Sequence, residues 1–472
     1  MMAPPRKTKV VCTVGPASRA PGTIRRLVPF VDVFRINFSH GDSTSHLEEI
    51  AAIRSESRRA GKNTAVLQDL PGPKIRVGKM RDGAAYLEKG SRFALTSMDM
   101  LGDQTRATVN YPALLESVDT GDLLYLADGL IKLRVDQKTN EGVGCTVLSG
   151  GVLSSGKGVN APGVKMKVEY PTPRDIEHIR FGQAHAVDFV AASFVRTPED
   201  IRAVRRLANS GGQFLIAKIE KKEAVENFDA ILHEADGVMV ARGDLGIETP
   251  IQGVPAVQKD IIRKCNAVGK PVIVATQMLI SMVSSPVPSR AEVTDVTTAI
   301  LDGTDAVMLS DETAVGEYPV ESVQMLDKIS RSAERLAIRS PAVDRQAMAG
   351  TSEEAIGRAA CSLADYVGAK AIVAPTQTGS TAKRVAMCRP RQPIVALCAE
   401  PRVARTMMLY NGVIPVIARR AKTVDWLFRR ADSAALNLGL AKRGERIVVT
   451  CGTPGMKGST NLIRLSVIGS QA

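Results

Sequence analysis

Eight short, nearly continuous apolar runs rich in β-branched residues recur along the chain, and helix-like segments separate most of them. The runs span residues 9–15, 31–41, 63–72, 188–195, 213–220, 237–246, 271–279 and 305–314. Continuous apolar character is typical of parallel strands buried on both faces, whereas half-exposed strands alternate apolar and polar residues. Eight strand–helix units in succession predict a (β/α)8 barrel, an α/β fold.

One connection in this series, between the third and fourth runs, is far too long for a single crossover. Residues 72–168 alternate apolar and polar residues with period two, and Asp128-Gly129 is a hairpin signal. We therefore expect an inserted domain, a small β-barrel-like lid hinged over the mouth of the barrel. The catalytic barrel itself is then assigned to residues 1–71 and 169–338.

A polar stretch near residue 338 ends the barrel pattern, and helix-like and strand-like segments alternate again afterwards. This predicts a C-terminal α/β regulatory domain over residues 339–472.

Two turns of this domain, 375–387 and 452–461, are rich in Thr, Ser and Gly, and we expect them to lie near each other. The first leads from a strand into a helix, where phosphate groups bind readily. Ordinary helix capping is the alternative for each turn. The candidate effector residues of the first turn are Thr376, Thr378, Gly379, Ser380 and Thr381.

The formal net charge of +13 suits a protein that binds anions, from nucleic acids to phosphorylated metabolites. Aromatic residues make up only 4% of the chain, which argues against a base-stacking nucleic-acid surface. The basic run 418–431 fits solvated helix faces, with an anion or subunit contact as the alternative.

The cysteine pattern and the hydropathy indicate the compartment. There are seven cysteines, an odd number, without zinc-like spacing, and no apolar run approaches the roughly 18 residues of a membrane span. The basic N-terminus has no apolar region behind it. We expect reduced thiols in a cytoplasmic protein that is neither exported nor membrane-bound.

Polar side chains gather where the predicted strands end, which is where active sites form in (β/α)8 barrels. They are Arg35, Asn37, Ser39, His40, Asp69, Lys74, Arg76, Ser193, Lys218, Glu220, Arg242, Asp244, Thr276, Gln277, Ser310, Asp311 and Glu312. Cations, acids and hydroxyls that converge on one face are hard to explain as structural residues. We interpret the set as an active site.

Lys218 and Glu220 are two residues apart on a strand, so they point to the same side. Glu220 and Asp244 come from neighbouring strands and make an oxygen site suited to Mg²⁺. A lysine beside such a site can stabilise charge on a transferred group, although an internal Lys218–Glu220 salt bridge is the alternative. The amides of Gly243 and Asp244 and the hydroxyl of Thr276 could bind a ligand carboxylate.

Lys157 lies in a glycine-rich loop, residues 154–163, that could reach phosphates. The loop lacks the spacing and the following Ser or Thr of a Walker A motif, so its sequence alone does not establish that it binds phosphate.

These motifs come in an order and at spacings that resemble the pyruvate kinase family. The resemblance covers nearly the whole chain and rests on RKTKVVCTVGPAS, FRINFSHG, DLPGPKIRVG, GKGVNAPG, AKIE, GVMVARGDLGIE, ATQML and MLSDETA. It implies transfer of the phosphoryl group of phosphoenolpyruvate to ADP, giving pyruvate and ATP in the last step of glycolysis, with Mg²⁺ or Mn²⁺. It also implies a homotetramer with an allosteric site, for a sugar phosphate or AMP, and no nucleic-acid or membrane partner.

The resemblance implies roles for individual residues. By this resemblance, Arg35 binds the substrate phosphate, and Lys218 stabilises the transferring phosphoryl group and the enolate. Glu220 and Asp244 bind Mg²⁺, while the substrate carboxylate is held by Gly243, Asp244 and Thr276. The nucleotide is contacted by Arg76, Lys157 and His40, and the proton route to the enolate carbon uses Thr276 and Ser310.

The family's potassium site, in contrast, departs from the potassium-dependent pattern. Its residues match Asn37, Ser39, Asp69 and Leu70. The potassium-dependent branch resembles Asp-Thr-Lys-Gly-Pro-Glu-Ile-Arg-Thr, whereas residues 69–77 read DLPGPKIRV, with Lys74 in place of the glutamate. A lysine ammonium is a compact monovalent cation on a flexible stem. The resemblance therefore implies that Lys74 replaces potassium and that K⁺ is not required.

Two other functions stay open. Another barrel that acts on phosphoenolpyruvate or pyruvate, such as a mutase or aldolase-like lyase, shares the acid pair but lacks the inserted domain and Lys157. A catalytically silent homologue that serves as a regulatory or nucleic-acid-binding subunit fits the charge of +13. The intact Arg35, Lys218 and Glu220 argue against it.

Overall fold

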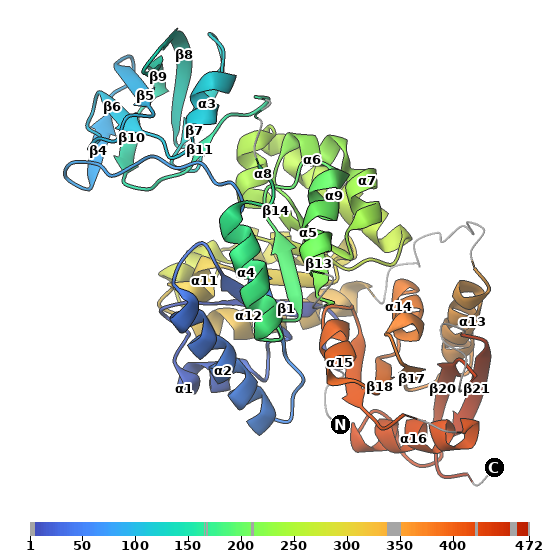
Figure 1. Cartoon of the computed structure of the whole chain (residues 1–472). Helices are drawn as coiled ribbons and strands as arrows, with labels where there is room; N and C mark the ends of the chain where they lie inside the picture. The colour runs from blue at the N-terminus through green and yellow to red at the C-terminus, as the bar shows by residue number, and fades with distance from the viewer. Residues whose placement is uncertain are drawn as a thin grey trace.

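In a computed structural model of the protein, the described residues form one closed barrel and three open sheets (Figure 1). The structure describes residues 5–164, 166, 169–208, 212–337, 351–420, 423–453 and 460–470. In Figure 1 the insert, whose strands lie within residues 84–160, and the C-terminal domain, whose elements lie within residues 352–467, project from opposite sides of the barrel.

Eight parallel strands close the barrel in the order β1-β16-β15-β14-β13-β12-β3-β2. Their bounds are β1 Lys9–Val14, β2 Val33–Asn37, β3 Ala65–Asp69, β12 Phe189–Ala192, β13 Phe214–Ile219, β14 Gly237–Ala241, β15 Val272–Ala275 and β16 Ala306–Leu309. Each strand lies within one of the eight apolar runs, so the predicted (β/α)8 barrel is confirmed.

Helices follow the strands and cover the outside of the barrel. They are α1 Pro21–Leu27, α2 Ser43–Arg59, α4 Pro173–Ala184, α5 Pro198–Ala208, α6 Lys222–Glu226, α7 Phe228–Glu234, α8 Arg242–Glu248, α9 Val254–Ala267, α10 Arg290–Leu301, α11 Asp311–Ala314 and α12 Pro319–Ala337, with the 3-10 turns η2 Ile251–Gly253 and η3 Ile280–Val283. Asp42, Thr172 and Ser289 begin α2, α4 and α10 with capping boxes, in which the cap side chain accepts a backbone N–H three residues on.

Alternate residues of each strand point into the barrel, and their character changes along the strand. On β13 the interior residues Phe214 and Ile216 are followed in the same series by Lys218 and Glu220. On β3 the same alternation ends at Asp69. Apolar layers thus fill the lower barrel, and charged side chains occupy its carboxyl end.

The insert has its own core, in which Leu87, Phe93 and Leu133 are fully buried. Its elements are β4 Ala84–Leu87, β5 Arg92–Thr96, β6 Arg106–Thr108, α3 Pro112–Ser117, β7 Leu123–Leu126, β8 Ile131–Thr139, β9 Gly142–Ser149, β10 Gly151–Ser154 and β11 Val159–Asn160. They form a six-stranded sheet, β11-β7-β8-β9-β5-β6, and a ribbon, β10-β4. The predicted hairpin is confirmed, because Asp128 and Gly129, both at positive φ, connect antiparallel β7 and β8.

The C-terminal domain is an open five-stranded sheet in the order β19-β18-β17-β20-β21, in which β21 is antiparallel. Its elements are α13 Ser352–Tyr366, β17 Ile372–Thr376, α14 Ser380–Met387, β18 Ile394–Cys398, α15 Pro401–Met407, β19 Val413–Ile417, α16 Val424–Asn437, β20 Arg446–Cys451 and β21 Leu462–Val467. The polar stretch that we expected before this domain lies largely at 338–350, outside the described residues.

The C-terminal domain packs against the amino ends of the barrel strands. Lys9 Nζ donates to the carbonyl of Val413 at 2.6 Å, and Arg389 pairs with Asp305 at 2.8 Å. Interior residues of the barrel and apolar residues of this domain belong to one continuous core cluster. The carboxyl ends of the strands, where the site residues lie, are therefore left for the insert.

The cysteines lie in the interior, and part of the basic run lies on a helix surface. All seven cysteines are buried. Arg429 and Arg430 lie exposed on α16, which fits a solvated helix face. Within the described residues, no helix is long and apolar enough to cross a membrane.

Candidate active site

Four of the predicted site residues form a buried network of ion pairs at the carboxyl end of the barrel. Arg35 Nε lies 2.6 Å from Asp69 Oδ2. Lys218 Nζ lies 3.1 Å from Asp69 Oδ1 and 2.9 Å from Glu220 Oε1. Of these side chains, Lys218 is 11% exposed and Glu220 1%. Two cations and two acids are thus held together in surroundings from which most water is excluded.

The network sets the charge states of its members. Burial alone would lower the pKa of Lys218, but the Asp69 and Glu220 carboxylates outweigh it and raise that pKa above its ordinary value. Burial alone would raise the pKa of Asp69, yet Lys218 and Arg35 hold it below the usual range. Lys218 is therefore a stable ammonium and Asp69 a stable carboxylate. The Lys218–Glu220 salt bridge that we considered is present, as part of this larger network.

Glu220 and Asp244 form the acid pair that the sequence predicted. Burial raises the pKa of Glu220, and the negative charge of Asp244 adds to it, while Lys218 opposes both. The charge of Asp244 thus acts on Glu220, and a divalent cation held by both carboxylates would relieve this repulsion. Their hard oxygen donors fit Mg²⁺ and leave coordination positions for water and substrate. Across the described residues no group of three or more His, Cys, Asp or Glu side chains could hold a metal.

Thr276 and Gly243 are in direct contact at the ends of β15 and β14. The Gly243 N–H donates to Thr276 Oγ1 at 2.8 Å. Thr276 has a φ of +71°, a left-handed conformation that is strained for a β-branched residue. Arg242 pairs with Asp295 at 2.7 Å and donates to the carbonyl of Thr276 at 2.9 Å. The strained turn thus directs the Thr276 hydroxyl to the first turn of α8.

Ser310 follows β16 and is held by a buried acid. Its N–H donates to Glu312 Oε2 at 2.8 Å, and Glu312 Oε1 accepts the N–H of Leu279 at 2.9 Å. Burial raises the pKa of Glu312. Glu312 therefore links the segments that follow β15 and β16 and carry Thr276 and Ser310.

The predicted nucleotide contacts come from both the insert and the barrel. Arg76 Nη1 donates to the carbonyl of Gly156 at 2.8 Å, beside the exposed side chain of Lys157. Burial lowers the pKa of His40, and the charges of Arg76 and Arg35 lower it further. The charge of Arg76, on the insert, thus acts on His40 of the barrel, and Lys157 directly follows Gly156, whose carbonyl accepts the Arg76 hydrogen bond.

The four residues of the potassium pattern lie at the ends of β2 and β3, where Asn37 is paired in register with Asp69. Asn37 Oδ1 accepts the N–H of Ser39 at 3.1 Å. Lys74 Nζ lies instead 3.5 Å from Asp244 Oδ1 and 5.9 Å from the ring centroid of Phe194. The structure thus brings Lys74 to Asp244 of the acid pair, and the replacement of potassium stays a prediction.

One member of the site was missed in the sequence. Thr13 Oγ1 accepts Arg35 Nη1 at 3.0 Å and is buried. The signal was present, because Thr13 is two residues after the interior residue Val11 and continues its inward series.

The candidate effector residues form the turn between β17 and α14. Thr376 Oγ1 accepts the N–H of Gly379 at 2.9 Å, whereas the N-cap of α14, Gly379, offers no side-chain capping bond. Thr381 Oγ1 lies 2.9 Å from Thr460 Oγ1, which brings the second glycine-rich turn beside the first, as predicted. Residues 454–459 of that second turn lie outside the described residues.

Known proteins match the chain along almost all of its length. Residues 5–323 match the family model described as "Pyruvate kinase, barrel domain", and residues 354–466 match that described as "Pyruvate kinase, alpha/beta domain". The chain is 45% identical to a pyruvate kinase of Geobacillus stearothermophilus, over 98% of this chain and 80% of that protein. For a pyruvate kinase of Staphylococcus saprophyticus the identity is 43%, over 99% and 81%. For one of Thermococcus litoralis it is 42%, over 98% and 99%.

Proposed function

The chain belongs to the pyruvate kinase family, and we propose that Arg35, Lys218 and the pair Glu220–Asp244 carry out its reaction. The chain is a phosphotransferase that moves the phosphoryl group of phosphoenolpyruvate to ADP, giving pyruvate and ATP. Family membership favours this activity over the mutase or lyase and over the silent subunit. The observation that carries the assignment of residues is the buried Arg35–Asp69–Lys218–Glu220 network at the carboxyl end of the barrel.

Phosphoryl transfer needs positioning and charge neutralisation more than covalent help. Arg35 is held from two sides by Asp69 and Thr13, so it offers a fixed cation to the phosphate of the substrate. Lys218 keeps its proton because its pKa is raised, and its ammonium stabilises the negative charge of the transferring group and of the enolate.

The family implies a divalent metal, and we assign Mg²⁺ to Glu220 and Asp244. When bound, Mg²⁺ supplies further neutralisation of phosphate and enolate oxygens. The protein residues around it orient the substrate: the first turn of α8, with Gly243 and Asp244, faces the substrate carboxylate. The hydroxyl of Thr276 is in contact with that turn, and it delivers a proton to the enolate carbon along a route shared with Ser310.

Arg76 and Lys157 of the insert and His40 of the barrel contact the phosphates and the base or sugar of the nucleotide. Electrostatics supports this assignment, because the positive charge of Arg76 on the insert lowers the pKa of His40 on the barrel. Movement of the insert toward the barrel closes the space between them around the nucleotide and excludes water.

Several features of the whole protein remain part of the proposal. The catalytic barrel comprises residues 1–71 and 169–338, the lid 72–168 and the regulatory domain 339–472. The enzyme is a homotetramer whose turn at 376–381 binds a sugar phosphate or AMP. It acts in the cytoplasm, which the seven buried cysteines without zinc-like spacing favour, and it works without K⁺.

The experiment that tests the function is an assay of the purified chain with phosphoenolpyruvate, ADP and Mg²⁺, in which pyruvate and ATP are both quantified. We expect equal amounts of the two products, and no turnover by Lys218→Met. Pyruvate formed without ATP would indicate a lyase or phosphatase, and a folded wild-type chain without turnover would indicate a silent subunit.

A further inference from the structure

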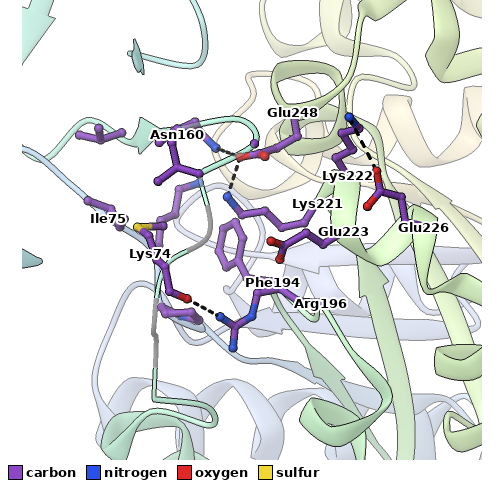
Figure 2. Close-up of a pocket in the computed structure, with 16 residues that line it drawn as sticks. Lys74, Ile75, Asn160, Phe194, Arg196, Lys221, Lys222, Glu223, Glu226 and Glu248 are labelled. Atoms are coloured by element: carbon purple, nitrogen blue, oxygen red, sulfur yellow. Dashed lines mark hydrogen bonds and ion pairs between the residues drawn. The ribbon is translucent and has the colours of Figure 1, made fainter. Parts of the chain in front are cut away.

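The insert and the barrel meet at Glu248, a buried carboxylate that accepts hydrogen bonds from both. Its Oε1 lies 2.6 Å from Lys221 Nζ of the barrel and 3.2 Å from Asn160 Nδ2 of the insert. Figure 2 shows both donors directed at this one carboxylate at the edge of a pocket between the two parts. The side chain of Glu248 is only 3% exposed, so water is a poor substitute for either donor.

Two of these residues adjoin the acid pair along the chain. Lys221 directly follows Glu220 after β13. Glu248 ends the same seven-residue helix, α8, that carries Asp244 in its first turn. Asn160 is the insert's contribution, on β11. The contact therefore ties the insert to the two segments that place the acid pair.

A neighbouring contact supports the same placement of the insert against the barrel. A Cβ atom on Gly129, in the turn between β7 and β8, would lie 3.7 Å from Cγ1 of Ile247. The turn of the insert thus lies against the residue that precedes Glu248.

Next to the Glu248 contact, the insert and the barrel are separated by a cavity. A cavity of about 190 Å³ lies between the segments that connect the insert and the helices α6 and α8, lined by Ile75 and Val164 on one side and by Glu223 on the other. Because packing is interrupted there, polar contacts align the two parts: the Glu248 contact, the Lys74–Asp244 pair, and the hydrogen bond from Arg196 Nη1 to the carbonyl of Met166 at 3.2 Å.

We propose that Glu248 is a positioning residue, which sets the orientation of the insert and so places Arg76 and Lys157 opposite the acid pair. The inference rests on the proposed function, because the readout in solution is the binding of ADP between insert and barrel. The contacts to phosphoenolpyruvate come from the barrel alone. Loss of the contact therefore weakens ADP binding and leaves phosphoenolpyruvate binding unchanged.

The kinetic test compares Asn160→Ala and Glu248→Gln with the control Glu226→Gln, an exposed acid on the same pocket whose partner Lys222 lies at 3.7 Å. We expect the KM for ADP to rise about tenfold in both variants, the equivalent of one hydrogen bond to a charged group, with the KM for phosphoenolpyruvate unchanged. Glu226→Gln should match the wild type. Equal increases in both KM values, or none, would overturn the proposal. Asn160→Ala leaves the Lys221–Glu248 pair in place, so it provides the test even if Glu248→Gln does not fold.

A second readout needs no activity and separates this inference from the proposed function. All native cysteines are buried, so dyes can be attached to cysteines introduced at two exposed positions, Lys89→Cys on the insert and Ala256→Cys on α9. Single-molecule energy transfer should show a broader distance distribution in Asn160→Ala than in the wild type. An unchanged distribution would contradict the positioning role, whereas a wild type without turnover would contradict the proposed function only.

Discussion

Asp69 Oδ1 lies 3.1 Å from Lys218 Nζ, although β12 separates the strands of the two residues in the barrel. The second oxygen of the same carboxylate lies 2.6 Å from Arg35 Nε. One acid thus holds the two cations to which we assign the phosphoryl group, and it keeps them apart and oriented. The resemblance to the family had placed Asp69 only in the potassium pattern, and its contacts give it a further role.

Replacement of Asp69 by asparagine should therefore impair both stability and turnover. Two buried cations would lose their shared counter-ion, which costs about 3 kcal/mol in the free energy of unfolding. We expect kcat to fall about a hundredfold, because small displacements of positioned groups have such effects. Denaturant unfolding and steady-state kinetics measure the two quantities. Asp260→Asn, at an exposed ion pair with Arg263, should change neither, and a fully active Asp69→Asn enzyme would refute this role.

The hydroxyl of Thr276 gives a second prediction. Thr276→Ala removes the acceptor of the Gly243 N–H and the proposed proton donor, so kcat should fall about a hundredfold, the usual size of an acid–base contribution. Thr276→Ser keeps the hydroxyl and should retain most of the activity. If the alanine and serine variants had the same kcat, the hydroxyl would have no part in the proton route.

The lysine at position 74 leads to the prediction that the enzyme does not require K⁺. We expect equal rates in potassium and in tetramethylammonium salts for the wild type. Lys74→Glu should need K⁺ or be inactive, because it also places a carboxylate beside Asp244, where the ammonium now lies at 3.5 Å. A large loss of wild-type activity without K⁺, or a fully active variant without K⁺, would count against the role of Lys74.

The pair Arg6–Asp32, at 2.8 Å, predicts a pH dependence of stability. Burial alone would raise the pKa of Asp32, but Arg6, Lys62 and Lys9 hold it well below the usual range. The folded state therefore binds this proton less readily than the unfolded chain. The stabilisation by the ionised Asp32 is complete above the pKa of this residue in the unfolded chain, about 3.9. It is lost as the pH falls below that value toward the pKa in the folded state.

Asp32→Asn should accordingly lower the free energy of unfolding by about 3 kcal/mol at pH 7, and by less and less below about pH 4. Thermal unfolding of both proteins between pH 3 and pH 7 measures the difference. Asp119→Asn, at a highly exposed side chain, serves as the control. A difference that stayed constant over the whole range would show that the charge of Asp32 is not responsible.

Much of the site could be predicted because it depends on local order along the chain. The alternation of a strand determines that Lys218 and Glu220 point the same way as Phe214 and Ile216. The barrel rule then places every strand end at one mouth. The same alternation would have identified Thr13, had its series from Val11 been followed to the end of β1.

Other relationships lay beyond the sequence because they depend on distances between segments far apart in the chain. The left-handed conformation of Thr276 has no signature in its residue type, since threonine rarely adopts it. No local sequence pattern connects Lys74 to Asp244. The orientation of the segment that leads into the insert decides which acid the flexible side chain of Lys74 reaches.

By itself, the sequence determined the eight strands, the inserted and C-terminal domains, and the set of residues at the mouth, because each of these follows from periodicity and motif order. The tertiary structure alone decided which charges meet: Asp69 with Lys218 and Arg35, and Glu248 with Asn160 and Lys221. The physical reason is that an ion pair depends on ångström distances between side chains, which only the closure of the barrel and the seating of the insert establish.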